Sequence, residues 1–308
     1  MKFSMHESFD PDSAAAWQVR LFKKSVTRQA VLKNLQRLLS PVDSKTCLDV
    51  GGDHGIIPWM LRKNGGIWLS VDANGASVAD MRVILGEDQV YQIEGAELPF
   101  EDESFDTLVV IHYLESLRDD AAFIRECHRC LKSKGELIFC VRHIKSFSTA
   151  RALGHLLGVR RLGNVRPGYR QRDLYEITKD GFDMVETVTF GGTLTACLDT
   201  LLEKFTGENL ARGYRINEAG MLTDPQQLRR FAKAVNLHAL FYPLQKLAAG
   251  LDALFRFTND HHIVVKARPR PWIERKSVKL KDGRSIAEAA IRTKIGTAID
   301  HIKPLPGT

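Results

Sequence analysis

The stretch Cys47–Gly55, with the sequence CLDVGGDHG, decides the fold class of this 308-residue chain. An apolar segment runs directly into Gly51 and Gly52, and Gly55 follows shortly after. Closely spaced glycines at the end of a strand let the backbone approach a ligand, because glycine accepts positive φ and has no Cβ. Asp53 stands where the commonest form of such a turn has another glycine. The stretch alone is compatible with a cofactor loop or an ordinary turn.

Predicted strands and helices alternate around this loop. Continuous apolar runs predict strands at residues 46–50, 67–72, 90–94, 105–114 and 135–143. Helical spacing of apolar residues predicts helices at 26–39, 56–65, 76–85 and 119–131. Apolar strands separated by helices are typical of a parallel sheet that is covered on both faces. The chain is therefore predicted to form a doubly wound α/β domain.

Polar residues and glycines gather where these predicted strands end. Asp72 closes the second strand about 20 residues after the loop, where a carboxylate can accept hydrogen bonds from both hydroxyls of a ribose. Glu94-Gly95-Ala96 closes the third strand, and Ser104-Phe105-Asp106 leads into the fourth. Since doubly wound sheets bind ligands at the carboxyl ends of their strands, we expect a nucleotide-like ligand at this edge.

This ordered set resembles the class I S-adenosylmethionine-dependent methyltransferases over roughly residues 20–145. The matching segments are LDVGGDHG (48–55), SVDAN (70–74), EGAELPFEDESFD (94–106) and FIRECHRCLKSKGELIF (123–139). The resemblance implies a Rossmann-like sheet of seven mostly parallel strands, with S-adenosylmethionine as cofactor and methyl transfer as reaction. It also implies an antiparallel closing strand, for which DHHIVVKARP (260–269) is the candidate.

By this resemblance, the glycine loop holds the methionine part of the cofactor, the acid after the second strand holds the ribose, and the end of the third strand faces the adenine. The cofactor-binding residues predicted in this way are Asp49, Gly51, Gly52, Asp53, Gly55, Asp72, Ala73, Glu94, Gly95, Ala96, Ile111 and His112. Asp53 is read as a tolerated substitute for glycine in a left-handed conformation, at a cost on the order of 1–2 kcal/mol.

The Asp-His pair of the loop also resembles bacterial transfer-RNA adenine-N1 methyltransferases. That group's glycine-rich segment after the fourth strand is replaced here by VIHYLES (110–116), so the likeness does not extend to the substrate.

A general base is optional in such a site, because the sulfonium already carries an activated methyl group. The predicted catalytic candidates are His112, Tyr113 and His143, each with side-chain packing as the alternative role. Histidine is the candidate that titrates nearest neutral pH. No metal site is expected, since the lone C-x-x-C at Cys127 and Cys130 lies in a predicted helix and is better explained by packing.

The second half of the chain carries the clues to the methyl acceptor. An insertion at 191–258 contains an amphipathic segment, 229–257, which Pro243 is expected to break. We interpret the insertion as a lid, a substrate platform or a membrane-facing element, with a packed helix pair or a dimer interface as alternatives. Arg166 and Tyr169, in the arginine-rich loop 163–176, are predicted to bind the acceptor, because arginine suits a phosphate or a carboxylate. A solvated basic loop is the alternative.

Charge and composition limit the remaining possibilities. From Lys266 to Thr308 there are 11 Lys/Arg and four Asp/Glu, against 33 of each sign before Lys266, so the C-terminal part carries the whole net charge of +7. Such a tail indicates an anionic partner, a membrane surface or a nucleic acid, or else a solvated extension. The five cysteines lie mostly in apolar or helical runs, and no secretory signal is evident. We expect a cytoplasmic protein, with a peripheral position at the inner face of a membrane as a further alternative.

The sequence thus predicts five segments and one leading function. The segments are an N-terminal helical part (1–45), a Rossmann-like cofactor-binding domain (46–190), the helical insertion (191–258), a closing strand (259–267) and a basic extension (268–308). The leading function is methyl transfer to a small or lipid-linked acceptor such as a glycan precursor; the alternatives are an RNA methyltransferase and a noncatalytic cofactor-binding module. The Asn-Pro-Pro-Tyr and Pro-Cys segments of base-modifying enzymes do not occur, so nucleic acid is the less favoured partner. The acceptor atom and the oligomeric state stay open.

Overall fold

A computed structural model of the chain describes residues 13–144, 148–159, 165–207, 224–254 and 261–273. The chain divides into a compact unit, Met1–Pro271, and a second unit, Trp272–Thr308, of which only the first two residues are described. The predicted basic extension therefore lies almost wholly outside the described residues.

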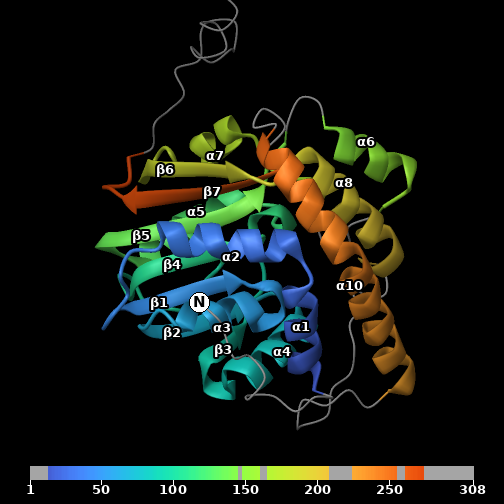
Figure 1. Cartoon of the computed structure of the whole chain (residues 1–308). Coiled ribbons are helices and arrows are strands. Elements are labelled where there is room, and N and C mark those ends of the chain that lie inside the picture. Colours follow the sequence, from blue (N-terminus) through green and yellow to red (C-terminus); the bar gives the residue numbers. More distant parts are fainter. Residues whose placement is uncertain (1–12, 145–147, 160–164, 208–223, 255–260, 274–308) are drawn as a thin grey trace, which may run out of the picture. The chain divides into compact units, whose positions relative to one another are not determined.

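A seven-stranded sheet forms the centre of the first unit, in the order β3-β2-β1-β4-β5-β7-β6 (Figure 1). All pairs from β3 to β5 are parallel, and β7 is antiparallel to both of its neighbours. The strands are β1 (Thr46–Gly51), β2 (Ile67–Asp72), β3 (Val90–Gln92), β4 (Phe105–Ile111), β5 (Leu131–Arg142), β6 (Phe182–Phe190) and β7 (His262–Pro269). The predicted fold class, with its antiparallel closing strand, is confirmed.

Helices cover both faces of this sheet. They are α1 (Ala14–Lys23), α2 (Val26–Leu38), α3 (Ile56–Arg62), α4 (Gly75–Leu85), α5 (Asp120–Cys130), α6 (Thr149–Leu156), α7 (Gln171–Thr178), α8 (Thr193–Leu202) and α10 (Pro225–Leu254). Successive strand residues point to opposite faces, so Leu48 and Val50 pack in one apolar core with α5 and α7, whereas Cys47 packs in a second core with α1, α2 and α3. Both apolar cores extend along the sheet, and their packing holds the ends of the strands in fixed positions.

The helix predicted at 26–39 is confirmed as α2 (Val26–Leu38), and α1 precedes it. Ser25 caps α2, because its hydroxyl accepts a hydrogen bond from the backbone N–H of Arg28 at 3.3 Å. Residues 1–12 lie outside the described part of the chain.

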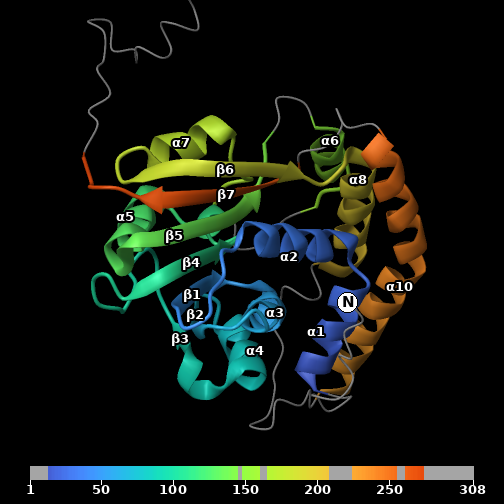
Figure 2. The ribbon, with the colours of Figure 1, turned by 60° about the vertical axis from the view of Figure 1, so that its left-hand side comes forward.

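Pro243 does not break the amphipathic segment, as it was expected to do. It lies inside the 30-residue helix α10, which runs unbroken from Pro225 to Leu254. Proline removes one backbone hydrogen bond from a helix interior, but α10 is held by packing on both sides of it: Phe231 and Ala234 are buried before the proline, and Ala248 after it. Figures 1 and 2 show α10 running beside α8 and α1.

The start of α8 is fixed by one carboxylate of α10. Asp252 is 3% exposed and accepts hydrogen bonds from the backbone N–H groups of Leu194 and Thr195 at 3.0 and 2.9 Å, and from the Thr195 hydroxyl at 2.8 Å. A Cβ at Gly192 would lie 1.9 Å from the Asp252 Cγ, so only glycine allows this approach. The contact joins two helices that are distant in the sequence.

We predict that Asp252→Ala lowers the free energy of unfolding by about 2–4 kcal/mol, because three buried donors lose their acceptor and a helix loses its cap. Urea unfolding followed by circular dichroism measures the change. The control is Asp88→Ala, which removes an exposed carboxylate from another helical turn and should leave stability within about 0.5 kcal/mol. Equal effects of the two substitutions would contradict the capping role.

Candidate functional site

The residues predicted from the sequence meet at one edge of the sheet, where β1, β2 and β4 end. Gly51 is paired with Ile111 across β1 and β4, and Asp72 is paired with Gln92 across β2 and β3. The backbone N–H of Ile93 donates to the carbonyl of Asp72 at 3.1 Å, which keeps the chain after β3 against the end of β2. The loop after β1 and the segment after β3 therefore lie along the same edge.

Two glycines of the loop are required by close approach. Gly51 has φ of 77°, and a Cβ there would lie 2.4 Å from the carbonyl oxygen of Ile111. Gly52 has φ of 128°, and a Cβ there would lie 2.5 Å from the Pro58 ring. The positive φ and the close contacts exclude a side chain at both positions. The backbone at this turn therefore carries no side chain at residues 51 and 52, so a ligand can approach it closely.

A buried carboxylate, Asp49, lies beneath the loop. One of its oxygens, Oδ2, accepts hydrogen bonds from Arg62 Nη1 at 3.0 Å and from Ser70 Oγ at 2.8 Å. The other oxygen, Oδ1, is buried without a hydrogen-bond partner among the described residues and lies 3.9 Å from the position of a Cβ at Gly52. Burial raises the pKa of Asp49 to about 6, although Arg62 and Ser70 lower it. Asp49 Oδ1 is therefore an acceptor that a positively charged donor of a ligand could satisfy.

His54 is a left-handed non-glycine residue of this loop, with φ of 59°. The strain expected at Asp53 stays a prediction. The His54 Nδ1 lies 2.6 Å from Asp80 Oδ2 on α4. Burial raises the pKa of Asp80, and the hydrogen bond from His54 lowers it. The sequence analysis missed Asp80, whose signal was an acid inside an otherwise apolar helical run.

Residues after β2 and β3 form the far part of the edge. Asp72 accepts hydrogen bonds from the backbone N–H of Asn74 at 3.0 Å and from Ser77 Oγ at 2.7 Å. Ala73 and Glu94 are exposed, and the Gly95 carbonyl accepts a hydrogen bond from the Tyr113 hydroxyl at 2.8 Å. Burial raises the pKa of Tyr113. Tyr113 thus connects the end of β4 to the end of β3, with its hydroxyl engaged.

The end of β4 carries His112, a residue with a left-handed backbone (φ 52°). Its Nδ1 lies 3.2 Å from Oε1 of buried Glu115, and its Nε2 lies 3.9 Å from the sulfur of Cys140 on β5. Burial lowers the pKa of His112, but the Cys140 sulfur and the Glu115 carboxylate outweigh it and raise the pKa to about 10. A general base works best with a pKa near the operating pH, so this arrangement does not favour the base role predicted for His112.

The remaining predicted residues lie beyond the end of β5. His143 forms an isolated bridge with Tyr169, whose hydroxyl is buried and donates at 2.8–2.9 Å to Asp120 and to the Leu114 carbonyl. Arg166 forms an ion pair with Asp120 at 2.7 Å. Tyr169 and Arg166 are therefore engaged inside the protein, and their role in acceptor binding stays a prediction, as does catalysis by His143.

Comparison with known proteins assigns the central part of the chain. Residues 48–139 match the family model described as a methyltransferase domain. This segment is a class I methyltransferase domain. The whole sheet, to which β6 and β7 contribute from outside this segment, has the order 3-2-1-4-5-7-6, which is typical of methyltransferase folds. The domain contains the glycine loop, the edge residues of β2 and β3, and His112.

Sequence relatives of this methyltransferase domain occur in two strains of Mycobacterium tuberculosis, where they are named as S-adenosylmethionine-dependent methyltransferases. Each is 31% identical over 116 residues, which is 38% of this chain and 42% of the relative. The chain therefore matches about two fifths of the length of these curated relatives. Among solved structures, a protein of Bacillus halodurans assigned as a methyltransferase has the same fold, with a TM-score of 0.50, 16% identity, and coverage of 78% of this chain and 98% of its own.

We predict that Gly51→Ala destabilises the protein more than Gly95→Ala. The two glycines have similar φ values, 77° and 68°, but a Cβ at Gly95 meets nothing within 4 Å. Each substitution should lower the free energy of unfolding by about 1–2 kcal/mol, because alanine disfavours a left-handed backbone. Gly51→Ala should lower it by a further amount of about 1–3 kcal/mol, because its Cβ would clash with the Ile111 carbonyl. Urea unfolding of the two variants measures the difference, and equal destabilisation would refute the close packing at this turn.

Proposed function

We propose that the protein is an S-adenosylmethionine-dependent methyltransferase. The observation that carries the proposal is the bare turn at Gly51 and Gly52 above the unsatisfied Oδ1 of Asp49. The methionine part of this cofactor ends in an ammonium group, which would supply the missing donor. The domain family and the names of the curated relatives support the same cofactor.

Different residues along the edge would bind different parts of the cofactor. The loop backbone at Gly51, Gly52 and Gly55 would receive the methionine part, and the Asp72 carboxylate would accept hydrogen bonds from the ribose hydroxyls. The segment Glu94–Ala96 would lie against the adenine. The bound cofactor supplies an activated methyl group on a sulfonium, so the protein has chiefly to orient an acceptor and keep water out.

We further propose that the acceptor is lipid-linked and is met at a membrane surface. The carboxyl-terminal half of α10 has an inverted distribution of side chains: Gln245 and Asp252 are 0% and 3% exposed, whereas leucines face outward. The outward leucines are Leu240, Leu244, Leu247, Leu251 and Leu254, with exposures of 39–76%. They recur at helical spacing and form one stripe.

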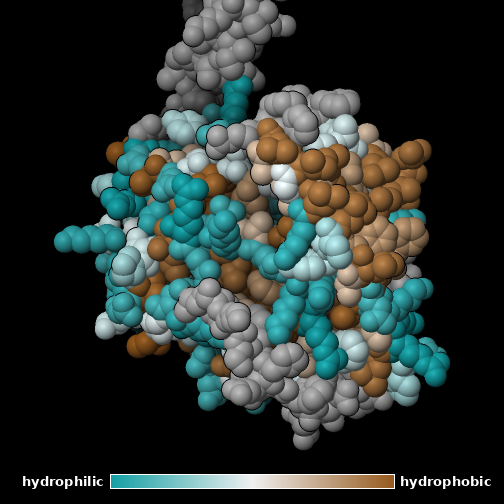
Figure 3. Space-filling model, viewed as in Figure 1, coloured by the Kyte–Doolittle hydropathy of each residue, from teal (hydrophilic) through white to brown (hydrophobic). Residues whose placement is uncertain are grey.

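Neighbouring elements extend this stripe. Leu156 on α6, Leu194 on α8 and Phe205 just after α8 are also exposed. Figure 3 shows hydrophobic side chains gathered over α8 and the adjoining part of α10. Contiguous exposed apolar surface of this kind marks an interaction site.

The charges of α10 favour an anionic bilayer as the partner. The basic residues of the helix are Arg229, Arg230, Lys233 and Lys246, and its one acid, Asp252, is buried against α8. Lysine and arginine beside an apolar stripe are the composition of helices that lie in the interface of anionic membranes. Among the described residues, no helix is both long and apolar enough to cross a membrane. The proposal is therefore a surface contact that brings the edge residues to an acceptor held in the bilayer.

We predict that Asp72→Ala weakens binding of S-adenosylhomocysteine at least about tenfold, because hydrogen bonds to a charged acceptor are worth about 1.5–3 kcal/mol each. Isothermal titration calorimetry measures the affinity. The control is Ser77→Ala, which removes the local hydrogen bond to Asp72 and keeps the carboxylate. Undetectable binding by the unaltered protein would refute the enzyme proposal, and unchanged affinity in Asp72→Ala would refute the placement of the ribose.

We predict that the unaltered protein cosediments with phosphatidylcholine vesicles containing phosphatidylglycerol, and that Leu244→Glu with Leu247→Glu weakens this binding at least about tenfold, since two apolar side chains are lost from the contact. Ile67→Glu changes an exposed apolar residue at the start of β2 and is the matched control. Binding that survives the leucine substitutions would contradict the membrane contact. Salt-sensitive binding to RNA in place of vesicles would favour the RNA methyltransferase.

A further inference from the structure

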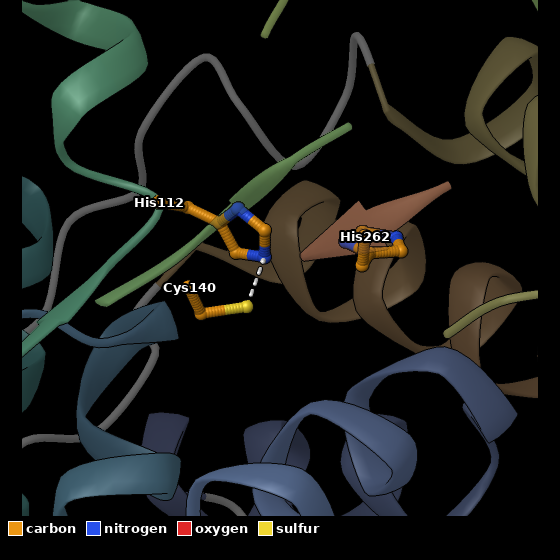
Figure 4. A group of neighbouring side chains, drawn as sticks. All are labelled: His112, Cys140 and His262. Atoms are coloured by element: carbon orange, nitrogen blue, oxygen red, sulfur yellow. Dashed lines mark hydrogen bonds between the residues drawn. The ribbon is translucent and has the colours of Figure 1, made fainter. Parts of the chain in front are cut away.

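Three potential metal ligands from three different strands meet beside the end of β4. His112 follows β4, Cys140 lies in β5, and His262 begins β7. One ligand atom from each lies within 4.8 Å of the others, and His112 Nε2 lies 3.9 Å from Cys140 Sγ. Figure 4 shows the His112 ring directed toward the cysteine sulfur, with His262 beside them.

The separation between His112 and Cys140 is close to that of two ligands of one bound ion, and the cluster as a whole spans at most 4.8 Å. Zinc bonds of about 2.3 Å to sulfur and about 2.0–2.1 Å to nitrogen, in tetrahedral geometry, place the two ligand atoms about 3.6 Å apart. The observed 3.9 Å between His112 and Cys140 therefore requires a movement of only a few tenths of an ångström. A set of two imidazoles and one thiolate is typical of zinc.

The residues around the cluster orient it for this role. Glu115 Oε1 lies 3.2 Å from His112 Nδ1 and accepts a hydrogen bond from the backbone N–H of Arg142 at 2.8 Å. A carboxylate on Nδ1 keeps the proton there and leaves Nε2 free for a metal, as in carboxylate–histidine–zinc arrangements. Glu115 Oε2 is buried and has no hydrogen-bond partner among the described residues, so the pocket carries negative charge that a cation would offset.

Packing holds the other two ligands in place. Cys140 is fully buried in the core between the sheet and α1, α2 and α3. The His262 ring is stacked on Phe190, with the ring centroids 5.3 Å apart, and lies edge-on to the His112 ring at 5.4 Å. His112 has a left-handed backbone (φ 52°), and strained conformations of this kind cluster at functional sites.

We propose that His112, Cys140 and His262 bind one zinc ion, with Glu115 as the residue that orients His112. On binding, the zinc ion displaces the proton of the Cys140 thiol and the proton on His112 Nε2, both of which are released to solvent, while Nδ1 keeps its proton and a water molecule takes the fourth position. Of the proposed ligands, His112 is also among the predicted cofactor-binding residues, whereas Cys140 and His262 are not. Loss of zinc from Cys140→Ser or His262→Ala, with cofactor binding retained, therefore separates this proposal from the proposed function.

The test loads the purified full-length protein with zinc, or with cobalt(II) as a spectroscopic probe, after removal of metals with a chelator. We expect one zinc per chain by elemental mass spectrometry, and a near-ultraviolet thiolate-to-cobalt charge-transfer band. Cys140→Ser should abolish the band, His262→Ala should weaken zinc binding at least about tenfold, and Glu115→Gln should weaken it about 10–100-fold.

Matched controls separate ligation from packing. Cys47→Ser removes another fully buried thiol from the same core, and Cys127→Ser disrupts the C-x-x-C of α5; both should keep the metal and the band. Circular dichroism checks that the variants are folded. If Cys140→Ser does not fold, the zinc affinity of His262→Ala tests the proposal instead. A charge-transfer band that survives Cys140→Ser, or unaltered protein that binds zinc no better than His262→Ala, would overturn the proposal.

Discussion

The close contact between Gly51 and the carbonyl of Ile111 is the constraint on which this edge of the sheet depends. β1 and β4 are still paired at these residues, and a Cβ at position 51 would lie 2.4 Å from the carbonyl oxygen. Glycine allows the two strands to stay together to their last residues, so β1 can turn into α3 while β4 continues to His112. The buried Asp49 carboxylate, the loop and the β4 end are brought to one place by this contact.

A second constraint is the placement of polar groups inside the helical insertion. Gln245 donates to Asp199 at 2.6 Å, and Asp252 accepts hydrogen bonds from the start of α8. Gln245 Nε2 and both oxygens of Asp252 have partners, whereas Gln245 Oε1 has none among the described residues. These hydrogen bonds explain why polar side chains are buried on this face of α10. Because α10 uses its polar residues to bind α8, its leucines are left on the outside. The same pattern that joins the two helices therefore creates the apolar stripe.

The fold could be predicted from the sequence because it depends on local patterns. Apolar strands alternating with amphipathic helices predict the sheet, and the glycines at 51, 52 and 55 predict the turn. The effect of Pro243 could not be predicted, because the contacts that keep α10 continuous come from α8, α1 and α2. The left-handed backbone of His54 was likewise not predicted, and the ring of this residue contacts Asp80 on another helix.

The residues around His112 were beyond prediction for a topological reason. Ligand spacing in a sequence reveals a metal site only when the ligands share one loop or helix, as in C-x-x-C. Cys140 and His262 are 122 positions apart and meet because β7 is inserted antiparallel beside β5, where Cys140 pairs with Val264, two residues from His262. A pattern of neighbouring residues cannot reveal a pairing made by the last strand of the sheet.

The end of β4 directs two consecutive side chains to different parts of the edge. His112 directs its ring toward Cys140, whereas the hydroxyl of Tyr113 donates to Gly95 after β3. The same short segment thus contacts the cluster at β5 and β7 with one side chain and the segment after β3 with the next. Its backbone is held by the hydrogen bond from His112 N–H to the Cys140 carbonyl at 2.9 Å. An ion bound at the cluster would restrict that segment, and the adjoining Ile111 carbonyl packs on Gly51 of the glycine loop, so a metal site and a cofactor site that both include His112 would share one rigid strand end.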